Sequence, residues 1–103
     1  MKRIIVLYGM PEDPAAFDRH YERQHVPLCM KMPRLRGFEV SRGPVAVSDP
    51  AGAYHCVAIL SYGSQEDLDY SLASPEGVAA VEDVANFATG GARIVTVETR
   101  SFV

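Results

Sequence analysis

The chain has 103 residues, the usual size of one domain with a single hydrophobic core. Hydrophobic residues make up 48% and charged residues 22%, a globular composition that excludes intrinsic disorder. The net charge is -3 with dispersed basic residues, and no apolar run is long enough to span a bilayer or to act as a secretion signal. We therefore expect one cytoplasmic domain over residues 1–103, with neither nucleic acid nor membrane as a partner.

The first segments predict a strand followed by a helix. The apolar, β-branched run from Arg3 to Gly9 is typical of a strand, and Asp13 before Pro14 marks a helix start. Because Pro27 lacks an amide hydrogen, we expect a kink or break between Gln24 and Pro27. Mostly apolar residues recur at three- and four-residue spacing and define the inward stripe of this helix: Phe17, Tyr21, Gln24 or His25, Leu28 and Met32.

The middle of the chain predicts a hairpin. Alternating apolar residues from Leu35 to Val47 indicate an irregular second strand, interrupted at Gly43-Pro44. Residues 48–52 have the composition of a turn, and the nearly continuous apolar run from Tyr54 to Tyr62 predicts a third strand.

The last third predicts a helix in two pieces and a final strand. Ser64 and Ser74 are each followed by acidic residues and are typical helix caps. The second piece ends at Gly90-Gly91, and Arg93 to Phe102 follows as a strand. We expect the second piece to turn one face toward the core: Val78, Val81, Val84 with Ala85, and Ala88.

The predicted order, strand, helix, strand, strand, helix, strand, is the βαββαβ arrangement of an α+β ferredoxin-like fold, an antiparallel sheet with both helices on one face. The runs 4–7 and 57–60 are apolar at every position, so both faces of the sheet are apolar. A second copy of the chain would cover the helix-free face, because a two-fold interface needs only one self-complementary patch. The sequence therefore predicts a homodimer whose sheets enclose a pocket, a dimeric α+β barrel.

His25 is the first candidate for chemistry, since it lies on the apolar helix stripe close to Pro27 and titrates near neutral pH. The alternative is a hydrogen-bonded core histidine that ties helix to sheet. Tyr21, one turn earlier, and Tyr8, at the end of the first strand, are candidates for donating a hydrogen bond to a substrate oxygen. Both tyrosines are equally compatible with core packing.

Three further residues are candidates for binding a substrate, namely His55 at the start of the third strand, Phe38 in the second strand, and Asp83. The sequence does not determine which face of the sheet His55 occupies. Asp83 and Asn86 share one side of the second helix, where the acid would orient a histidine or brace the helix end. His20 is expected at the surface. Cys29 and Cys56 are expected to be buried structural residues, and no nucleotide-binding motif or metal-ligating cluster is present, so we expect no cofactor.

Two motifs resemble the EthD-like family. The first spans positions 17–40 and includes Phe17, Tyr21, His25, Pro27-Leu28, Pro33, Leu35 and Phe38-Glu39-Val40; the second is Ser74-Pro75-Glu76-Gly77 with Asp83, Asn86-Phe87-Ala88 and Gly90-Gly91. The resemblance implies a dimeric α+β barrel, a fold shared with cofactor-free monooxygenases, muconolactone-type isomerases and polyketide cyclases. It also implies a histidine at position 25 at the barrel mouth, and a label of oxidoreductase or reductase derived from ethyl tert-butyl ether degradation.

Two functions follow from these observations. The first is a cofactor-independent enzyme of oxidoreductase or isomerase type, which acts on a small apolar or oxygenated organic molecule in a pocket lined by His25, Tyr8 and apolar strand residues. The second is a non-catalytic ligand-binding or accessory module of a degradation or biosynthetic pathway. An open cavity with His25 in its wall would favour the enzyme.

Overall fold

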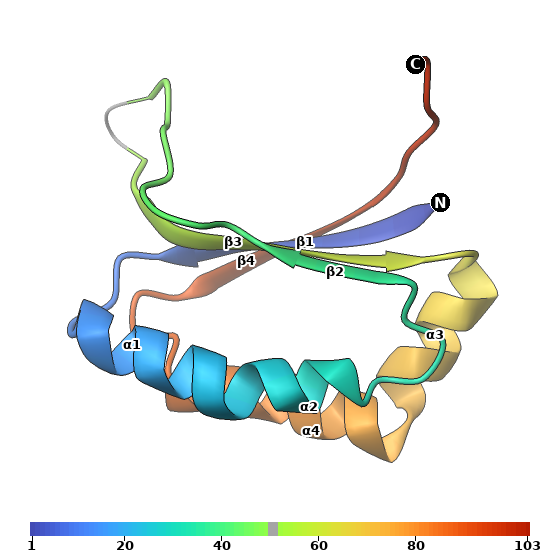
Figure 1. Cartoon of the computed structure of the whole chain (residues 1–103), viewed down its shortest axis with the longest axis horizontal. Helices are drawn as coiled ribbons and strands as arrows, with labels where there is room; N and C mark the ends of the chain where they lie inside the picture. The colour runs from blue at the N-terminus through green and yellow to red at the C-terminus, as the bar shows by residue number, and fades with distance from the viewer. Residues whose placement is uncertain (50–51) are drawn as a thin grey trace.

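The computed structural model describes residues 1–49 and 52–103. A four-stranded antiparallel sheet of order β2-β3-β1-β4 carries its helices on one face (Figure 1), so the expected ferredoxin-like α+β fold is confirmed. None of the described helices is long and apolar enough to cross a membrane. The elements are β1 (Lys2–Gly9), α1 (Pro14–His20), the π-helical turn η1 (Tyr21–His25), α2 (Val26–Met30), β2 (Gly37–Val40), β3 (Tyr54–Tyr62), α3 (Gln65–Ala73), α4 (Pro75–Asp83), the 3-10 turn η2 (Val84–Asn86) and β4 (Ala92–Glu98).

The first helical segment runs without a break from Pro14 to Met30, and the irregularity expected between Gln24 and Pro27 takes the form of a π-helical turn over Tyr21–His25 rather than of a break. The wide turn of η1 explains this: the amide of Val26 donates to the carbonyl of Tyr21, five residues back. Pro27 then falls in the first turn of α2, where a missing amide hydrogen costs little. The wide turn keeps both Tyr21 and His25 buried on the inner side of the helix.

The expected hairpin is present, since β2 and β3 pair antiparallel with Phe38 opposite Leu60 and Val40 opposite Ala58. Its first strand is shorter than expected and ends at Val40 rather than Val47. Residues 41–49 and 52–53 form part of a long loop in which Gly43 has a φ of 77°, a conformation that favours glycine. The expected turn at 48–52 is only partly described, because residues 50 and 51 lie outside the described residues.

The second helical region has the two expected pieces, α3 and α4. The hydroxyls of Ser64 and Ser74 cap them by accepting from the amides of Asp67 (3.1 Å) and Gly77 (3.0 Å). The expected inward face was wrong in part, because Val78 and Val81 are 43% and 54% exposed. The buried positions of α4 are Gly77, Ala80 and Asp83.

Small residues face inward on α4 because the helix turns sharply after α3. A side chain at Gly77 would collide with the backbone carbonyl of Ser71. The close approach therefore selects glycine and alanine on the inner side and leaves valines outside.

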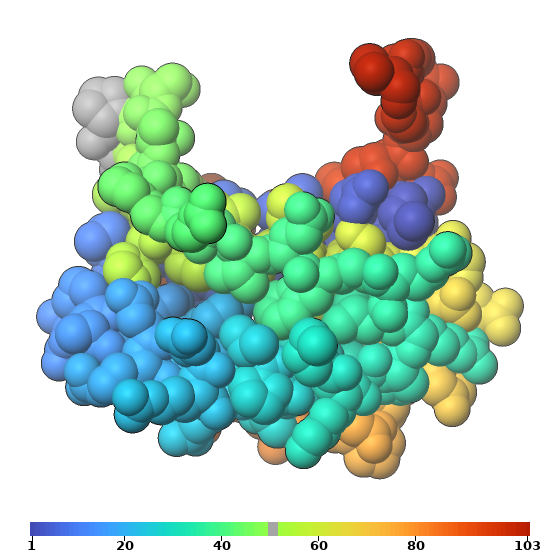
Figure 2. All heavy atoms as spheres, viewed as in Figure 1, coloured from blue at the N-terminus to red at the C-terminus, as the bar shows by residue number. Residues whose placement is uncertain are grey.

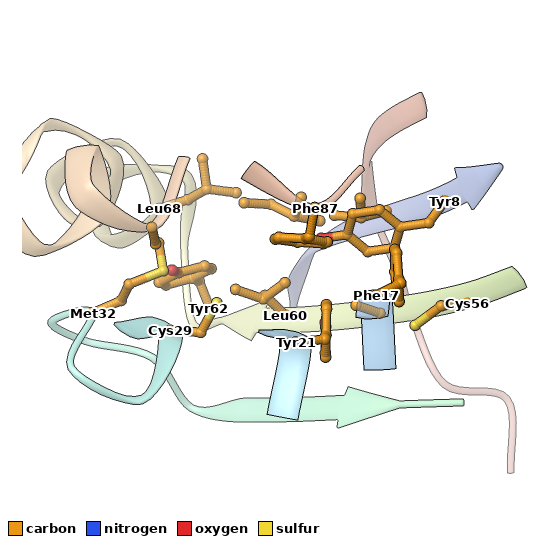
Figure 3. Packing of buried hydrophobic residues seen from close by; sticks show 14 residues of the cluster. Tyr8, Phe17, Tyr21, Cys29, Met32, Cys56, Leu60, Tyr62, Leu68 and Phe87 are labelled. Atoms are coloured by element: carbon orange, nitrogen blue, oxygen red, sulfur yellow. The ribbon is translucent and has the colours of Figure 1, made fainter. Parts of the chain in front are cut away.

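The core lies between the sheet and the helices (Figure 3). At one end it is aromatic: the ring of Phe87 lies 5.5 Å from Tyr8, 5.1 Å from Phe17 and 5.4 Å from Tyr21, measured between ring centroids. The opposite end contains Cys29, Met32, Leu60, Tyr62 and Leu68. Both cysteines are free and buried, as expected.

The helix-free side of the sheet has an apolar centre, as the sequence predicted, and by the pairing of the strands it also carries Arg3, Glu39 and Arg93. Because buried Ile4, Val6 and Tyr8 point toward the helices, the alternate residues of β1 point the other way. We call this surface the open face; its apolar members, by the pairing of the strands, are Ile5, Leu7, Val57, Ile59, Val95 and Val97. The loop after β2 and the C-terminal segment after β4 rise on this side at opposite ends of the sheet, with a hollow between them (Figures 1 and 2).

Candidate functional site

The carboxylate of Asp83 connects two helical segments at the aromatic end of the core. Its Oδ2 lies 2.9 Å from Nδ1 of His25, and its Oδ1 lies 2.8 Å from Nε2 of His20. The side-chain amide of Asn86 donates to the same Oδ1 at 3.0 Å. His25 is 3% exposed and Asp83 is 7% exposed, so this pair is shielded from water, whereas Asn86 is exposed.

Electrostatics fix the protonation of the His25 and Asp83 pair. Burial raises the pKa of Asp83, but hydrogen bonds from Asn86, His20 and His25 outweigh burial, so the pKa lies below its usual range. Burial lowers the pKa of His25, although Asp83 acts in the opposite direction. An ionised carboxylate only accepts hydrogen bonds, so a neutral His25 donates from Nδ1 and has its lone pair on Nε2. This arrangement gives an oriented base.

Tyr21 lies beside His25, with ring centroids 5.1 Å apart. Its hydroxyl is buried and is the one buried side-chain polar atom without a hydrogen-bond partner among the described residues. Burial raises the pKa of Tyr21 and also that of Tyr8, whose ring meets it edge to face at 5.6 Å. Both phenols therefore stay protonated at neutral pH. The hydroxyls of Tyr21 and Tyr8 are close enough for each to shift the pKa of the other, but that of Tyr21 completes no hydrogen bond of normal geometry among the described residues.

An open groove of about 980 Å³ lies between the first helix and the loop after β2. Phe17 and Tyr21 form its helical wall, Val40 and Val45 contribute from β2 and the loop, and Cys56 contributes from β3. The Tyr21 hydroxyl is thus an unpaired donor on a residue that lines an apolar groove. A groove of this size and lining suits a small organic molecule that carries an oxygen.

His55 also lines this groove. The pairing of β1 with β3 shifts between Tyr8 and Gly9, which pair with Cys56 and Tyr54, so His55 is the extra residue of a bulge. The bulge aims the imidazole toward the helix layer, where Nε2 lies 2.8 Å from Oδ1 of Asp18. The sequence did not determine which face of the sheet His55 occupies. The bulge places it on the helix-covered face at this edge of the sheet.

Comparison with known proteins identifies the family. The family model described as EthD domain matches residues 10–91. The chain belongs to the EthD family. An uncharacterized 11.0 kDa protein from the thcB-thcC intergenic region of Rhodococcus erythropolis is 42% identical to this EthD protein over 91 residues, which cover 88% of this chain and 87% of that protein.

Solved structures agree with this assignment. A crystal structure of an EthD family protein from Bacillus halodurans is 33% identical, with a TM-score of 0.85 over 97% of this chain and 99% of that chain. Two structures of lower identity share the fold. One is a dimeric ferredoxin-like protein of unknown function from Jannaschia (19% identity, TM-score 0.71, 95% and 98% covered), and the other is SnoaB, a cofactor-independent oxygenase from Streptomyces nogalater (15%, 0.69, 99% and 95%).

The structure of this EthD protein brings together four of the residues predicted from the sequence, namely Tyr8, Tyr21, His25 and Asp83. It does not give the expected pocket lined by His25 and Tyr8, because the groove is lined by Tyr21 and His55 while His25 and Tyr8 lie in the core. Phe38 also lies away from the groove and packs against the core.

Two residues of the EthD site were missed by sequence reasoning. His20 was expected at the surface, but it is partly buried and bound to Asp83. Asp18, the partner of His55, was not considered at all. Both contacts join residues far apart in sequence, and no local pattern signals them. Among the described residues, no group of His, Cys, Asp and Glu side chains is arranged to hold a metal ion.

Proposed function

We propose that this EthD protein is a homodimeric enzyme that binds a small, largely apolar, oxygenated organic molecule in the groove and transfers a proton from it to His25. The observation that carries the proposal is the Tyr21 hydroxyl, a buried donor with no partner among the described residues on a side chain that lines an apolar groove. Leaving such a group unpaired costs about 1–3 kcal/mol, which a ligand oxygen would recover.

In the proposed chemistry, one residue donates a hydrogen bond to the ligand and another accepts a proton from it. Tyr21, kept protonated by burial, donates to a ligand carbonyl or hydroxyl oxygen and stabilises negative charge that develops there. His25, neutral and oriented by Asp83, accepts the proton that the ligand loses. The C–H or O–H bond of the ligand breaks, an N–H bond forms at Nε2, and the charge remains on the oxygen held by Tyr21.

The proposed homodimer uses the open face. Its six apolar residues form one patch at the centre of the sheet, and a two-fold interface requires only that this patch fit itself. The structure from Jannaschia, which has the same fold, is described as dimeric. The two segments that rise beside the patch (Figure 2) would flank a second copy seated between them.

A non-catalytic binding module is the second candidate, and one observation favours it. His25 is 3% exposed and does not line the groove, so a ligand held by Tyr21 reaches the imidazole only if the intervening side chains move. In that case the Asp83 cluster serves stability alone.

Binding is tested with 1-naphthol and naphthalene, which share an apolar body and differ in one hydroxyl. Fluorescence titration should give about fivefold to tenfold tighter binding of 1-naphthol, the equivalent of one net hydrogen bond of roughly 1 kcal/mol. Tyr21→Phe should abolish this difference and leave naphthalene binding unchanged. Tyr70→Phe, at an exposed tyrosine, is the matched control.

Turnover is tested by exchange of the acidic α-protons of 2-tetralone into deuterium oxide, followed by NMR. The wild-type protein should accelerate exchange above the buffer rate, and His25→Gln should remove the acceleration while 1-naphthol still binds. Binding by the wild-type protein without any accelerated exchange would support the non-catalytic module.

A further inference from the structure

We propose that His55 and Asp18 form a second proton-accepting pair at the rim of the groove, which selects ligands with an ionisable hydroxyl at the end remote from Tyr21. This inference rests on the proposed function in one respect, because it requires the groove to be the ligand site. It adds a second polar anchor and thereby defines the substrate class: phenols and enols with an apolar body and a second oxygen.

The arrangement of rings places the two anchors at opposite ends of one surface. Phe17 stacks parallel to Tyr21, with centroids 5.7 Å apart, and meets the ring of His55 edge to face at 4.8 Å. All three residues line the groove. Phe17 therefore lies between Tyr21 and His55 in the wall of the groove, so a ligand against this wall has the Tyr21 side chain near one end and the His55 imidazole near the other.

The imidazole of His55 is oriented for proton exchange. Its Nε2 lies 2.8 Å from Oδ1 of Asp18. Because a carboxylate only accepts hydrogen bonds, the Nε2–H group donates to it, and the lone pair of the neutral imidazole is on Nδ1. Among the described residues no group bonds to this Nδ1. The His55 side chain is 18% exposed and that of Asp18 is 66% exposed, so the imidazole is largely shielded while its partner stays hydrated.

The charges around the groove favour a neutral hydroxyl over a carboxylic acid. Besides Asp18, the wall contains Glu22 from η1 and Arg42 from the loop, so two of its acids stand against this arginine. A ligand carboxylate would be repelled by the net negative charge of this wall.

The proton-transfer step is balanced. The O–H bond of the ligand breaks, an N–H bond forms at Nδ1 of His55, and the ligand oxyanion remains beside the imidazolium that Asp18 supports. No oxidant or further reactant is required. In this way Asp18 acts as a positioning residue, and His55 is the group that touches the ligand.

The probe for this step is 4-nitrophenol, whose ionised form has a distinct visible absorbance. At a pH where the free probe is mostly neutral, addition of the wild-type protein should convert the bound probe to the phenolate. His55→Gln should abolish that signal, and Asp18→Asn should reduce it severalfold. Asp69→Asn, at an exposed aspartate on α3, is the control for loss of one surface carboxylate and should retain the full signal.

The probe 4-nitroanisole has the same body without the ionisable proton and reports binding alone. It should bind the wild-type protein and His55→Gln with equal affinity, within about twofold. A phenolate signal that survives in His55→Gln, or that disappears in His25→Gln instead, would overturn the assignment to His55. If neither probe binds the wild-type protein, the groove is not the ligand site and the proposed function fails with it.

Discussion

Asp83 connects three helical segments through its carboxylate. Its two carboxylate oxygens join His20 at the end of α1, His25 in the π-helical turn and Asn86 in η2. Helical periodicity predicted that His25 faces inward, but it could not identify its partner, because residues 25 and 83 are far apart along the chain. Sequence spacing placed Asp83 only beside Asn86, which it also contacts.

The first prediction concerns this carboxylate. Asp83→Asn should lower the free energy of unfolding by about 3 kcal/mol. The new side-chain amide nitrogen would face an N–H donor of one histidine, and both His20 and His25 would lose a charged hydrogen-bond acceptor. Urea denaturation measures the loss. Glu82→Gln, at the exposed neighbouring position, should change stability by less than about 0.5 kcal/mol. Equal effects of the two substitutions would mean that the cluster contributes nothing to the fold.

The second prediction concerns pH. Because burial holds the pKa of His25 below its ordinary value near 6.5, the unfolded chain binds more protons than the folded chain just below that value. Stability therefore decreases as the pH falls through this window, by at most about 1.4 kcal/mol per pH unit for one proton. Asp83, whose pKa is lowered, adds a loss in the same direction at more acidic pH.

Thermal or urea unfolding between about pH 7 and pH 5 measures this slope. His25→Gln removes the titrating group and should flatten it, whereas Tyr70→Phe should leave it unchanged. An identical slope in wild type and His25→Gln would show that His25 titrates alike in the folded and unfolded states.

At the scale of elements, periodicity and capping signals predicted nearly every segment and missed what depends on close packing. The order of strands and helices, the two serine caps and the hairpin partners all follow from local residue patterns. The orientation of α4 does not, because size decides it: Gly77 and Ala80 face inward where α3 and α4 meet, and the larger valines point outward. Similarly, no local residue pattern predicted the π-helical turn over Tyr21–His25, in which the amide of Val26 donates to the carbonyl of Tyr21.

The third prediction tests that orientation. Val81→Glu should be tolerated, with a change in stability below about 0.5 kcal/mol, because the side chain is 54% exposed. Ala80→Glu should destabilise the protein by several kcal/mol, since it forces a charge into a position that is 3% exposed. Circular dichroism during thermal unfolding compares the two variants. The reverse ranking would restore the face that the sequence alone suggested.

At the scale of the whole molecule, the sheet has one face covered by its own helices, while no helix or strand of residues 1–49 and 52–103 covers the other face. The sequence predicted this condition correctly, because both β1 and β3 are apolar at consecutive positions. It placed the ligand in a pocket lined by His25, Tyr8 and apolar strand residues, whereas neither His25 nor Tyr8 lines the groove of the protomer. The structure places the groove at the edge of a single protomer, beside the loop after β2, and so separates the binding site from the surface proposed for dimerisation.

The fourth prediction uses this separation. Ile59 lies on the open face in β3, paired with Ile5, whereas Ile94 in the edge strand β4 alternates to the other face and is 59% exposed. In a two-fold dimer, Ile59→Lys introduces two charges into one apolar interface, at a cost on the order of 5 kcal/mol, or more than a thousandfold in the dimer dissociation constant. Light scattering coupled to size-exclusion chromatography should therefore show a folded monomer for Ile59→Lys and a dimer for both wild type and Ile94→Lys. Because the groove lies within one protomer, the monomeric variant should still bind 1-naphthol. A wild-type protein that is monomeric at micromolar concentration would show that something other than a second copy covers the open face.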